Sequence, residues 1–369
     1  MERPDGSEEN EQREEVWGKE GNMGNRTENG IDGHVHVFGK GTQGVRDMLA
    51  FEKELGYRAC NFLSCECMGD ATQNALGIYL KAVAPENYAF GGLTYRYDCD
   101  FAEELKTLWE IGFDGMKMVE DKPTIRKQLG VPFDDPHYDG FYGLLSQMQI
   151  PLVAHIADPE ECWHRDQIED WAYEAGYYYG DGGYVEKETL YREVEQVLAR
   201  FPKLRVVFAH LFFMSADLER LDDFMERHPN VSLDIVSGTE MYFNFAKRAE
   251  DWRQFFLKYQ DRIIYGTDNM NLYDEEEIRN ARITNAMQRD FLAKSGVIHA
   301  WDKATTGIEL PEEVQEKICS GNFLRIAGET PRPLNREAAA RYLQGRLENE
   351  RLAVTAEERA VIEEVLRIL

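Results

Sequence analysis

Short runs of apolar, β-branched or aromatic residues recur along the chain, and segments with helical spacing separate them. Val45, Met48, Leu49 and Leu55 mark one such helical segment. The eight apolar runs are GHVHVF (33–38), YRACNFLSC (57–65), YAFGGLTY (88–95), GFDGMKMV (112–119), PLVAHIA (151–157), LRVVFAHLF (204–212), VSLDIVSG (231–238) and RIIYGTD (262–268). The pattern therefore predicts eight strands with helices between them.

Regular alternation of strands and helices implies parallel strands joined by crossover helices. Eight such units over about 240 residues match the size of a (β/α)8 TIM barrel. A doubly wound open sheet is the alternative, but its first turn would carry a glycine-rich phosphate loop, and FGKGTQG (38–44) matches GxGxxG poorly. We therefore predict an α/β chain with a (β/α)8 barrel and extra C-terminal helices.

The chain divides into three predicted parts. Residues 1–30 hold nine acids and four bases without an apolar secretory core, which predicts a disordered acidic leader, with Met23 as an alternative start. Residues 31–328 form the barrel and end in the closing helix PEEVQEKICSGNFLRIAG (311–328). Residues 329–369 form a helical extension packed on the barrel, and a capping box of Thr355 and Glu358 begins its last helix.

One crossover helix has recognisable ends. In SADLERLDDFMERHP (215–229), Ser215 is the expected N-cap and Pro229 the expected stop.

Composition limits the classes of function. The net charge of −26 argues against nucleic-acid binding, and no apolar stretch is long enough to cross a membrane. Without a secretory signal, we expect a cytoplasmic protein whose cysteines are reduced thiols. Those cysteines are Cys60, Cys65, Cys67, Cys99, Cys162 and Cys319, and they form no CxxC pair. A small-molecule substrate is the expected partner, and the terminal helices are candidate interfaces of a homo-oligomer.

Two histidines lie in the first strand. Side chains two apart on a strand share one face, so His34 and His36 point the same way while Val35 and Val37 point the other way. Two converging neutral imidazoles form half of a metal site. The alternative is a pair of core histidines that donate hydrogen bonds to backbone carbonyls.

Three further residues lie near the ends of predicted strands. His155 belongs to the fifth strand, His210 to the sixth, and Asp268 ends the eighth. In a (β/α)8 barrel, active-site groups gather at the carboxyl ends of the strands. A single core histidine or turn aspartate needs no function, but coincidence at four strand ends favours a metal site.

These motifs make the chain resemble the amidohydrolase superfamily, specifically its amidohydrolase-related (amidohydrolase 2) branch, over roughly residues 31–328. The resemblance rests on His-Val-His in strand one, one histidine each in strands five and six, and GTD at strand eight. It implies one divalent metal ion, with Zn2+ preferred and Mn2+, Fe2+ or Co2+ also compatible. The implied ligands are His34, His36, His155 and Asp268.

The resemblance also implies catalytic roles. Asp268 would take a proton from the attacking water, and His210 would orient that water or bind a second metal. Lys117 and Glu120 on the fourth strand keep a binuclear site open, although a regular strand points only one of two residues three apart inward. A single metal is the favoured interpretation.

The leading function is therefore a metal-dependent hydrolase of an ester, lactone or amide. The alternatives are a nonoxidative decarboxylase of an aromatic or unsaturated acid, and an inactive barrel used for binding, which would not need all five residues. The long segment 158–188 is a candidate cover over the site. The candidate substrate-binding residues are Arg96, Lys117, Trp163 and Glu240.

Overall fold

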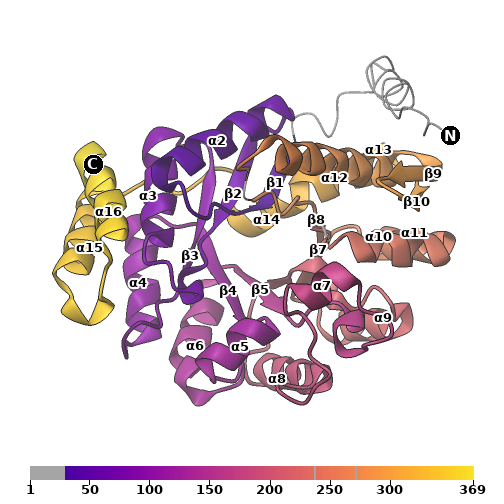
Figure 1. The fold of residues 1–369 in the computed structure, drawn as a ribbon, viewed down its shortest axis with the longest axis horizontal. Coiled ribbons are helices and arrows are strands. Elements are labelled where there is room, and N and C mark those ends of the chain that lie inside the picture. Colours follow the sequence, from indigo (N-terminus) through magenta and orange to yellow (C-terminus); the bar gives the residue numbers. More distant parts are fainter. Residues whose placement is uncertain (1–29, 237, 271) are drawn as a thin grey trace, which may run out of the picture.

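Eight parallel strands form one sheet in chain order, and helices surround it (Figure 1). The structure is a computed structural model that describes residues 30–236, 238–270 and 272–369. The strands are β1 (Ile31–Val35), β2 (Ala59–Leu63), β3 (Tyr88–Gly92), β4 (Gly115–Asp121), β5 (Leu152–Ile156), β6 (Val206–Phe208), β7 (Val231–Asp234) and β8 (Ile263–Ile264). The predicted (β/α)8 barrel with extra C-terminal helices is confirmed. The predicted leader, apart from Gly30, lies outside the described residues.

The backbone joins the first strand to the segment that follows β8. The Gly33 amide donates to the Tyr265 carbonyl at 3.1 Å, and the His36 amide donates to the Asn269 carbonyl at 3.0 Å. In the opposite direction, the Asp268 amide donates to the His34 carbonyl at 2.9 Å. This closure places Asp268 directly beside the two histidines of the first strand.

The crossover helices pack apolar faces on the strands, as α2 does with Val45, Met48 and Phe51. The helices that follow the strands are α2 (Gly41–Glu54), α3 (Gln73–Val83), α4 (Phe101–Ile111), α5 (Pro123–Leu129), α6 (Asp139–Met148), α8 (Lys187–Arg200), α9 (Leu218–Arg227), α10 (Thr239–Lys247), α11 (Ala249–Lys258) and α12 (Glu275–Ala293). The prediction of Ser215 as the N-cap of α9 is wrong. Asp217 caps this helix instead, and its side chain accepts from the Arg220 amide at 3.1 Å.

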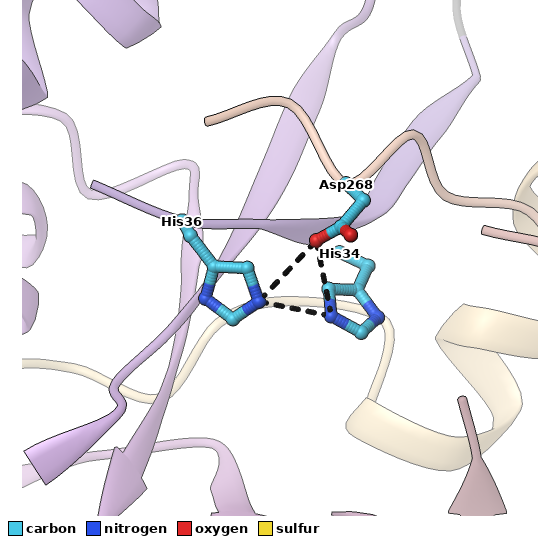
Figure 2. A group of neighbouring side chains, drawn as sticks. All are labelled: His34, His36 and Asp268. Carbon is cyan, nitrogen blue, oxygen red and sulfur yellow. Dashed lines mark hydrogen bonds and ion pairs between the residues drawn. The ribbon is translucent and has the colours of Figure 1, made fainter. Parts of the chain in front are cut away.

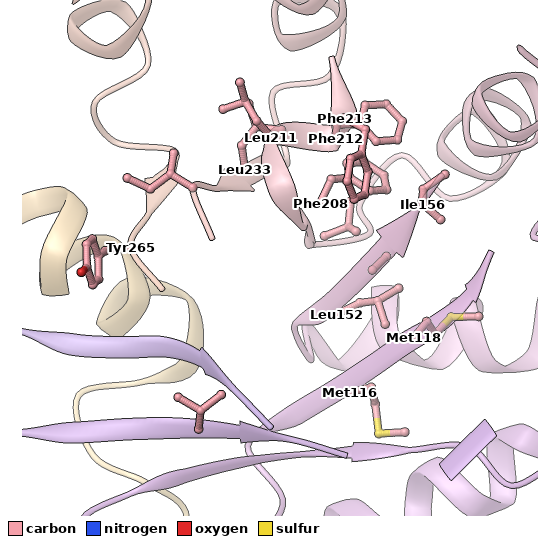
Figure 3. Packing of buried hydrophobic residues seen from close by; sticks show 14 of the residues in the cluster. Met116, Met118, Leu152, Ile156, Phe208, Leu211, Phe212, Phe213, Leu233 and Tyr265 are labelled. Carbon is pink, nitrogen blue, oxygen red and sulfur yellow. The ribbon is translucent and has the colours of Figure 1, made fainter. Parts of the chain in front are cut away.

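Buried side chains fill the space between strands and helices (Figure 3). A separate cluster closes the amino-terminal end of the barrel; it contains Ile31, Leu63, Tyr88, Phe90, Val153, Val207, Ile264 and Phe323. Phe323 belongs to α14 (Asn322–Ala327), which continues α13 (Glu312–Glu316) through a π-helical turn at Lys317–Gly321. The opposite end, at the carboxyl ends of the strands, is where active sites of this fold form.

Two features between β5 and the closing helix were not predicted. The segment after β5 contains a 3-10 turn (Glu160–Trp163) and the short helix α7 (Asp170–Glu174). An antiparallel hairpin of β9 (Ser295–Ala300) and β10 (Lys303–Ile308) follows α12. Its turn residue Trp301 has φ of 53°, a conformation that hairpin turns usually reserve for glycine or asparagine. Because a tryptophan stands here, the sequence carries no turn signal. Lys303 pairs with Glu169 just before α7, so the hairpin contacts the long segment after β5.

The C-terminal helices α15 (Arg336–Glu348) and α16 (Ala356–Ile368) pack beside α3 and α4, on the opposite side of the molecule from the hairpin (Figure 1). The capping box predicted for the last helix is confirmed, since the side chains of Thr355 and Glu358 both bond to backbone amides of the other residue. In the part of the chain that the structure describes, no helix combines the length and apolar character needed to cross a membrane.

Candidate metal centre and active site

His34 and His36 present their rings on one face of the first strand, as the strand period requires. Their Nε2 atoms lie 3.1 Å apart. The Oδ1 atom of Asp268 lies 3.7 Å from Nε2 of His34 and 3.5 Å from Nε2 of His36 (Figure 2). Three ligand atoms therefore converge at the carboxyl end of β1, all within 4.8 Å of one another.

The remaining ring nitrogens fix the orientation of both imidazoles. Nδ1 of His34 lies 2.9 Å from Oδ2 of Asp234, and Nδ1 of His36 lies 2.9 Å from the Leu63 carbonyl. Both acceptors require a proton on Nδ1, which leaves the Nε2 lone pairs directed at the point of convergence. Metal-binding histidines are commonly oriented in this way.

Burial favours the neutral form of each of these groups, which has opposite consequences for the histidines and for the aspartate. It lowers the pKa of His34 and His36 well below the usual value, and the charge of Lys117 lowers both further. The imidazoles are therefore neutral at pH 7. Burial also raises the pKa of Asp268 to about 8, against the opposing effect of Lys117. Ligation of a cation by Asp268 therefore requires loss of its proton, which a nearby positive charge favours.

The two predicted histidines of strands five and six lie together on another part of the same end. The ring centroids of His155 and His210 are 4.8 Å apart, and His210 lies 5.9 Å from His34. Nε2 of His155 lies 3.4 Å from Oδ1 of Asp158. The structure thus brings His34, His36 and Asp268 into one close group and leaves His155 paired with an acid outside that group.

His210 is held by its backbone and not by its ring. Its amide donates to Oδ1 of Asp234 at 2.7 Å, so Asp234 contacts both His34 and His210. Among the described residues, Nδ1 of His210 has no hydrogen-bond partner although it is buried. Burial lowers the pKa of His210 well below the usual value, with a further contribution from His155. The His210 ring is therefore neutral, and it lies beside the rings of His155 and His34.

The turn that presents His210 has unusual backbone geometry. His210, Leu211, Phe212 and Phe213 have φ of 54°, 53°, 57° and 50°, which places four consecutive non-glycine residues in the left-handed region. Left-handed backbone costs roughly 1–2 kcal/mol per residue, so it persists only where the surroundings hold it. The Tyr191 hydroxyl donates to the Phe212 and Phe213 carbonyls at 3.2 and 3.1 Å, and Lys187 donates to the latter at 3.1 Å.

Lys117 lies at the centre of the strand ends. Its Nζ is 3.4 Å from Nε2 of His34, and the side chain is buried. Glu120 is also buried, which raises its pKa to about 7. The pairing register of β4 is irregular between Met118 and Asp121, so the period-two rule does not apply across this pair. Lys117 contacts the close group, whereas the Glu120 carboxyl interacts with Tyr95.

The other candidate substrate-binding residues have partners away from the close group. Arg96 pairs with Glu358 of α16 and also donates to the Leu352 carbonyl at 3.2 Å. The indole of Trp163 donates to the Val185 carbonyl at 3.3 Å and packs against Tyr179. Glu240 is the second residue of α10, and burial raises its pKa to about 7, with a further contribution from Glu161.

The segment after β5 is anchored to the site through Asp158. The Tyr179 hydroxyl donates to Oδ2 of Asp158 at 2.6 Å, and Lys122 pairs with its Oδ1 at 2.6 Å. Burial opposes ionisation of Asp158, but Lys122 and His155 outweigh it and lower the pKa below the usual value. Of the aromatic residues in this segment, Trp171 is 64% exposed, so it does not wall a closed pocket in this conformation.

Sequence reasoning missed two acids at this end of the barrel. Asp234 ends β7 and Asp158 follows β5 by two residues, so both occupy strand-end positions of the kind that identified Asp268. The signal was present in VSLDIVSG and LVAHIAD. Neither lies in a histidine motif, and a strand-end aspartate is common as a turn residue, so position alone did not separate them.

The donor set fits a divalent cation. Two neutral imidazole nitrogens and one carboxylate oxygen suit zinc and other first-row divalent ions. The sequence model of the amidohydrolase family matches residues 65–326, which is most of the barrel. A search of curated protein sequences finds no match to the chain.

Several solved structures share the fold. A crystal structure described as amidohydrolase II has a TM-score of 0.54 and 14% identity, over 81% of this chain and 100% of that chain. For 2,6-dihydroxybenzoate decarboxylase in complex with 2,6-dihydroxybenzoate, the TM-score is 0.48 and the identity 14%, over 80% and 99%. A manganese complex of 5-carboxyvanillate decarboxylase from Novosphingobium aromaticivorans has a TM-score of 0.46 and 16% identity, over 76% and 79%. With the family match covering residues 65–326, the chain belongs to the amidohydrolase family, whose members are metal-dependent enzymes.

Proposed function

We propose that the protein is a metal-dependent hydrolase that cleaves an ester, lactone or amide bond of a small molecule. The observation that carries the proposal is the convergence of His34, His36 and Asp268 at the carboxyl end of the barrel. One divalent ion would be held by these three residues and by His155, with zinc preferred over manganese, iron or cobalt. The bound ion supplies Lewis acidity and lowers the pKa of water to about 7.

Asp268 is the proposed proton acceptor. Its Oδ1 faces both imidazoles, which leaves Oδ2 to take a proton from the attacking water. A positioned acid or base of this kind contributes about 10²–10⁴-fold to a rate. His210 is the proposed residue that orients the attacking water. Its ring lies 5.9 Å from that of His34, and burial lowers its pKa so that the imidazole is neutral.

Lys117 is the proposed site for a negatively charged or polarised oxygen of the substrate. Its ammonium is buried, and among the described residues no carboxylate lies within ion-pair distance of it. A buried cation without a counter-ion favours an anionic ligand. This observation also favours the second candidate function, nonoxidative decarboxylation of an aromatic or unsaturated carboxylic acid.

A substrate panel on metal-loaded protein tests the proposal. Purified protein is stripped with a chelator, reloaded separately with zinc, manganese, iron or cobalt, and assayed on lactones, esters, amides and aromatic carboxylates with detection of carbon dioxide. Hydrolysis that requires metal and is lost in Asp268→Asn supports the leading function. Metal-dependent release of carbon dioxide supports the second candidate, and a protein that binds no metal contradicts both.

A further inference from the structure

We propose that Glu52 on α2 is a positioning residue for Asp268. Glu52 contacts none of the proposed ligands. It holds Asn269, the residue directly after Asp268, and thereby fixes where the Asp268 carboxylate lies. The inference rests on the proposed role of Asp268 as a metal ligand, and it concerns a part of the molecule behind the site.

The backbone at Asp268 requires external support. Asp268 has φ of 60°, a left-handed conformation that an aspartate tolerates better than most residues but does not prefer. Beyond β8, which ends at Ile264, the backbone is held to the first strand by one isolated bridge between Val35 and Asn269 and by the bond from the Asp268 amide to the His34 carbonyl. The carboxylate direction depends on the backbone of residues 267–269, so the side-chain contacts of the two flanking residues add to this pairing in fixing Oδ1.

Each flanking residue is tied to a buried acid. On one side, the Thr267 amide donates to Oδ1 of Asp32 at 3.0 Å, and the Thr267 hydroxyl donates to Oδ2 of the same residue at 2.5 Å. On the other side, Nδ2 of Asn269 donates to Oε1 of Glu52 at 2.7 Å. The segment that carries Asp268 is therefore clamped from β1 through Asp32 and from α2 through Glu52.

The clamp on Asn269 continues into α12. Nδ2 of Asn285 donates to Oδ1 of Asn269 at 3.0 Å, and Oδ1 of Asn285 accepts from the Tyr57 hydroxyl at 2.9 Å. The side-chain amide of Asn269 is thus fixed at both its oxygen and its nitrogen. The Asn269 carbonyl also accepts a hydrogen bond from the His36 amide. Asn269 therefore connects the segment that carries His34 and His36 to the clamp.

The burial of Glu52 lowers the stability of the folded state. Its side chain is buried, and both burial and the adjacent Asp32 carboxyl raise its pKa well above the usual value, with only a minor opposing effect from Arg289. Burying an acid without a cation disfavours folding, so an apolar side chain would serve packing better. The hydrogen bond to Asn269 gives the acid a specific use. Glu52 is also a cleaner probe than Asp32, which bonds the His34 amide as well.

Two substitutions at position 52 separate positioning from packing. Glu52→Met keeps the approximate length and removes the acceptor, whereas Glu52→Gln keeps an acceptor oxygen for Asn269. The measurement is the zinc dissociation constant of the full-length protein, obtained by competition with a chromophoric chelator, together with kcat and KM. Replacing such supporting partners commonly weakens metal binding about 10–100-fold, so we expect that loss in Glu52→Met and near-normal affinity in Glu52→Gln.

Controls keep the result interpretable. Asp114→Leu removes a buried acid at the opposite end of the barrel, where Asp114 pairs with Lys81 at 2.6 Å, and it should lower thermal stability without changing zinc affinity. Asn285→Ala leaves Glu52 intact and should weaken zinc by a smaller factor, which preserves the test if Glu52→Met does not fold. Unchanged zinc affinity in Glu52→Met, or equal losses in Glu52→Met and Glu52→Gln, would overturn the positioning role. Absence of zinc binding by the wild type would instead overturn the proposed metal site.

Discussion

The two halves of the candidate site are constructed differently. On the side of β1 and β8, His34, His36 and Asp268 converge, and each imidazole is oriented through its Nδ1 by Asp234 or the Leu63 carbonyl. On the side of β5 and β6, His155 pairs with Asp158, and His210 is presented by a left-handed turn with its Nδ1 unpartnered among the described residues. The first half supplies three of the four proposed metal ligands, whereas the second supplies the fourth, His155, and the neutral imidazole of His210.

The four histidines of the site cannot be distinguished by their sequence positions, but the structure indicates different roles for them. All four histidines lie near strand ends, and burial lowers the pKa of all four. What distinguishes them is the partner of the second ring nitrogen and the geometry of the backbone. The comparison therefore predicts that substitution of His34, His36 or Asp268 affects metal content, whereas substitution of His210 affects turnover.

The largest effect is expected on the first side. Replacing both His34 and His36 with alanine removes two of the three converging ligand atoms, so most bound metal should be lost while the barrel stays folded. Elemental analysis after dialysis against a chelator measures the metal, and circular dichroism measures the fold. A folded double variant that keeps a full equivalent of metal would show that these histidines are not the ligands.

Asp268→Asn should come next. The amide oxygen carries no charge to offset a cation and is a poor base, so we expect turnover to fall by at least about 10³-fold and metal affinity to weaken. Steady-state kinetics and metal content are measured on the same preparation. Good activity at full metal content would remove Asp268 from the role of proton acceptor.

His210→Asn tests the second side. The three converging ligand atoms remain, so metal content should stay at the wild-type level while kcat falls about 10²–10⁴-fold. Measuring both quantities beside Asp268→Asn decides between the two halves. If His210→Asn halves the metal content, the site is binuclear, and His210 is itself a metal ligand.

The stability of metal-free protein should depend on pH through Asp268. Burial raises its pKa to about 8, above the ordinary value of 3.8, so the folded state keeps a proton that the unfolded state has lost. The contribution to stability is complete below about pH 4 and is lost as pH rises to about 8, by at most about 1.4 kcal/mol per pH unit. Urea unfolding in chelator at pH 6 and pH 8 should therefore show a smaller loss in Asp268→Asn than in the wild type.

The smallest effect is expected from Arg96→Met. Arg96 pairs with Glu358 of the last helix, so this change should lower the melting temperature slightly, by an amount that corresponds to about 1 kcal/mol, and leave KM unchanged. Lys117→Met provides the contrast, because Lys117 contacts the close group and should raise KM. A marked increase in KM for Arg96→Met would restore Arg96 as a substrate-binding residue.

The sequence predicted the barrel and the convergence of the first half for a physical reason. Apolar runs identify strands, and the two-residue period of a strand places His34 and His36 on one face whatever the rest of the chain does. The position of Asp268 followed from the closure of the barrel between its first and last strands. Each of these inferences needs only local pattern and topology.

The remaining features depend on contacts between distant residues. Nothing local marks the left-handed turn at His210, because its residues carry no glycine signal and its conformation is held by Tyr191 and Lys187. The pairing of Arg96 with Glu358 joins residues 262 positions apart. The role of Glu52 could not be predicted either, since its α2 position gives no sign that it faces Asn269 of the strand-eight loop.

The buried contact between the C-terminal helices and the loop after β2 has a consequence for recombination between related proteins. The family match ends at residue 326, which invites a crossover point just before the C-terminal helices. Yet Arg346 of α15 pairs with Glu66 at 2.6 Å, in a pair that is almost completely buried, and Glu66 follows β2 at the carboxyl end of the barrel. A chimera that exchanges only the last forty or so residues would leave Glu66 buried without its cation. The loop at residues 65–71 and the two terminal helices must therefore be exchanged together, although most of the barrel lies between them in the sequence.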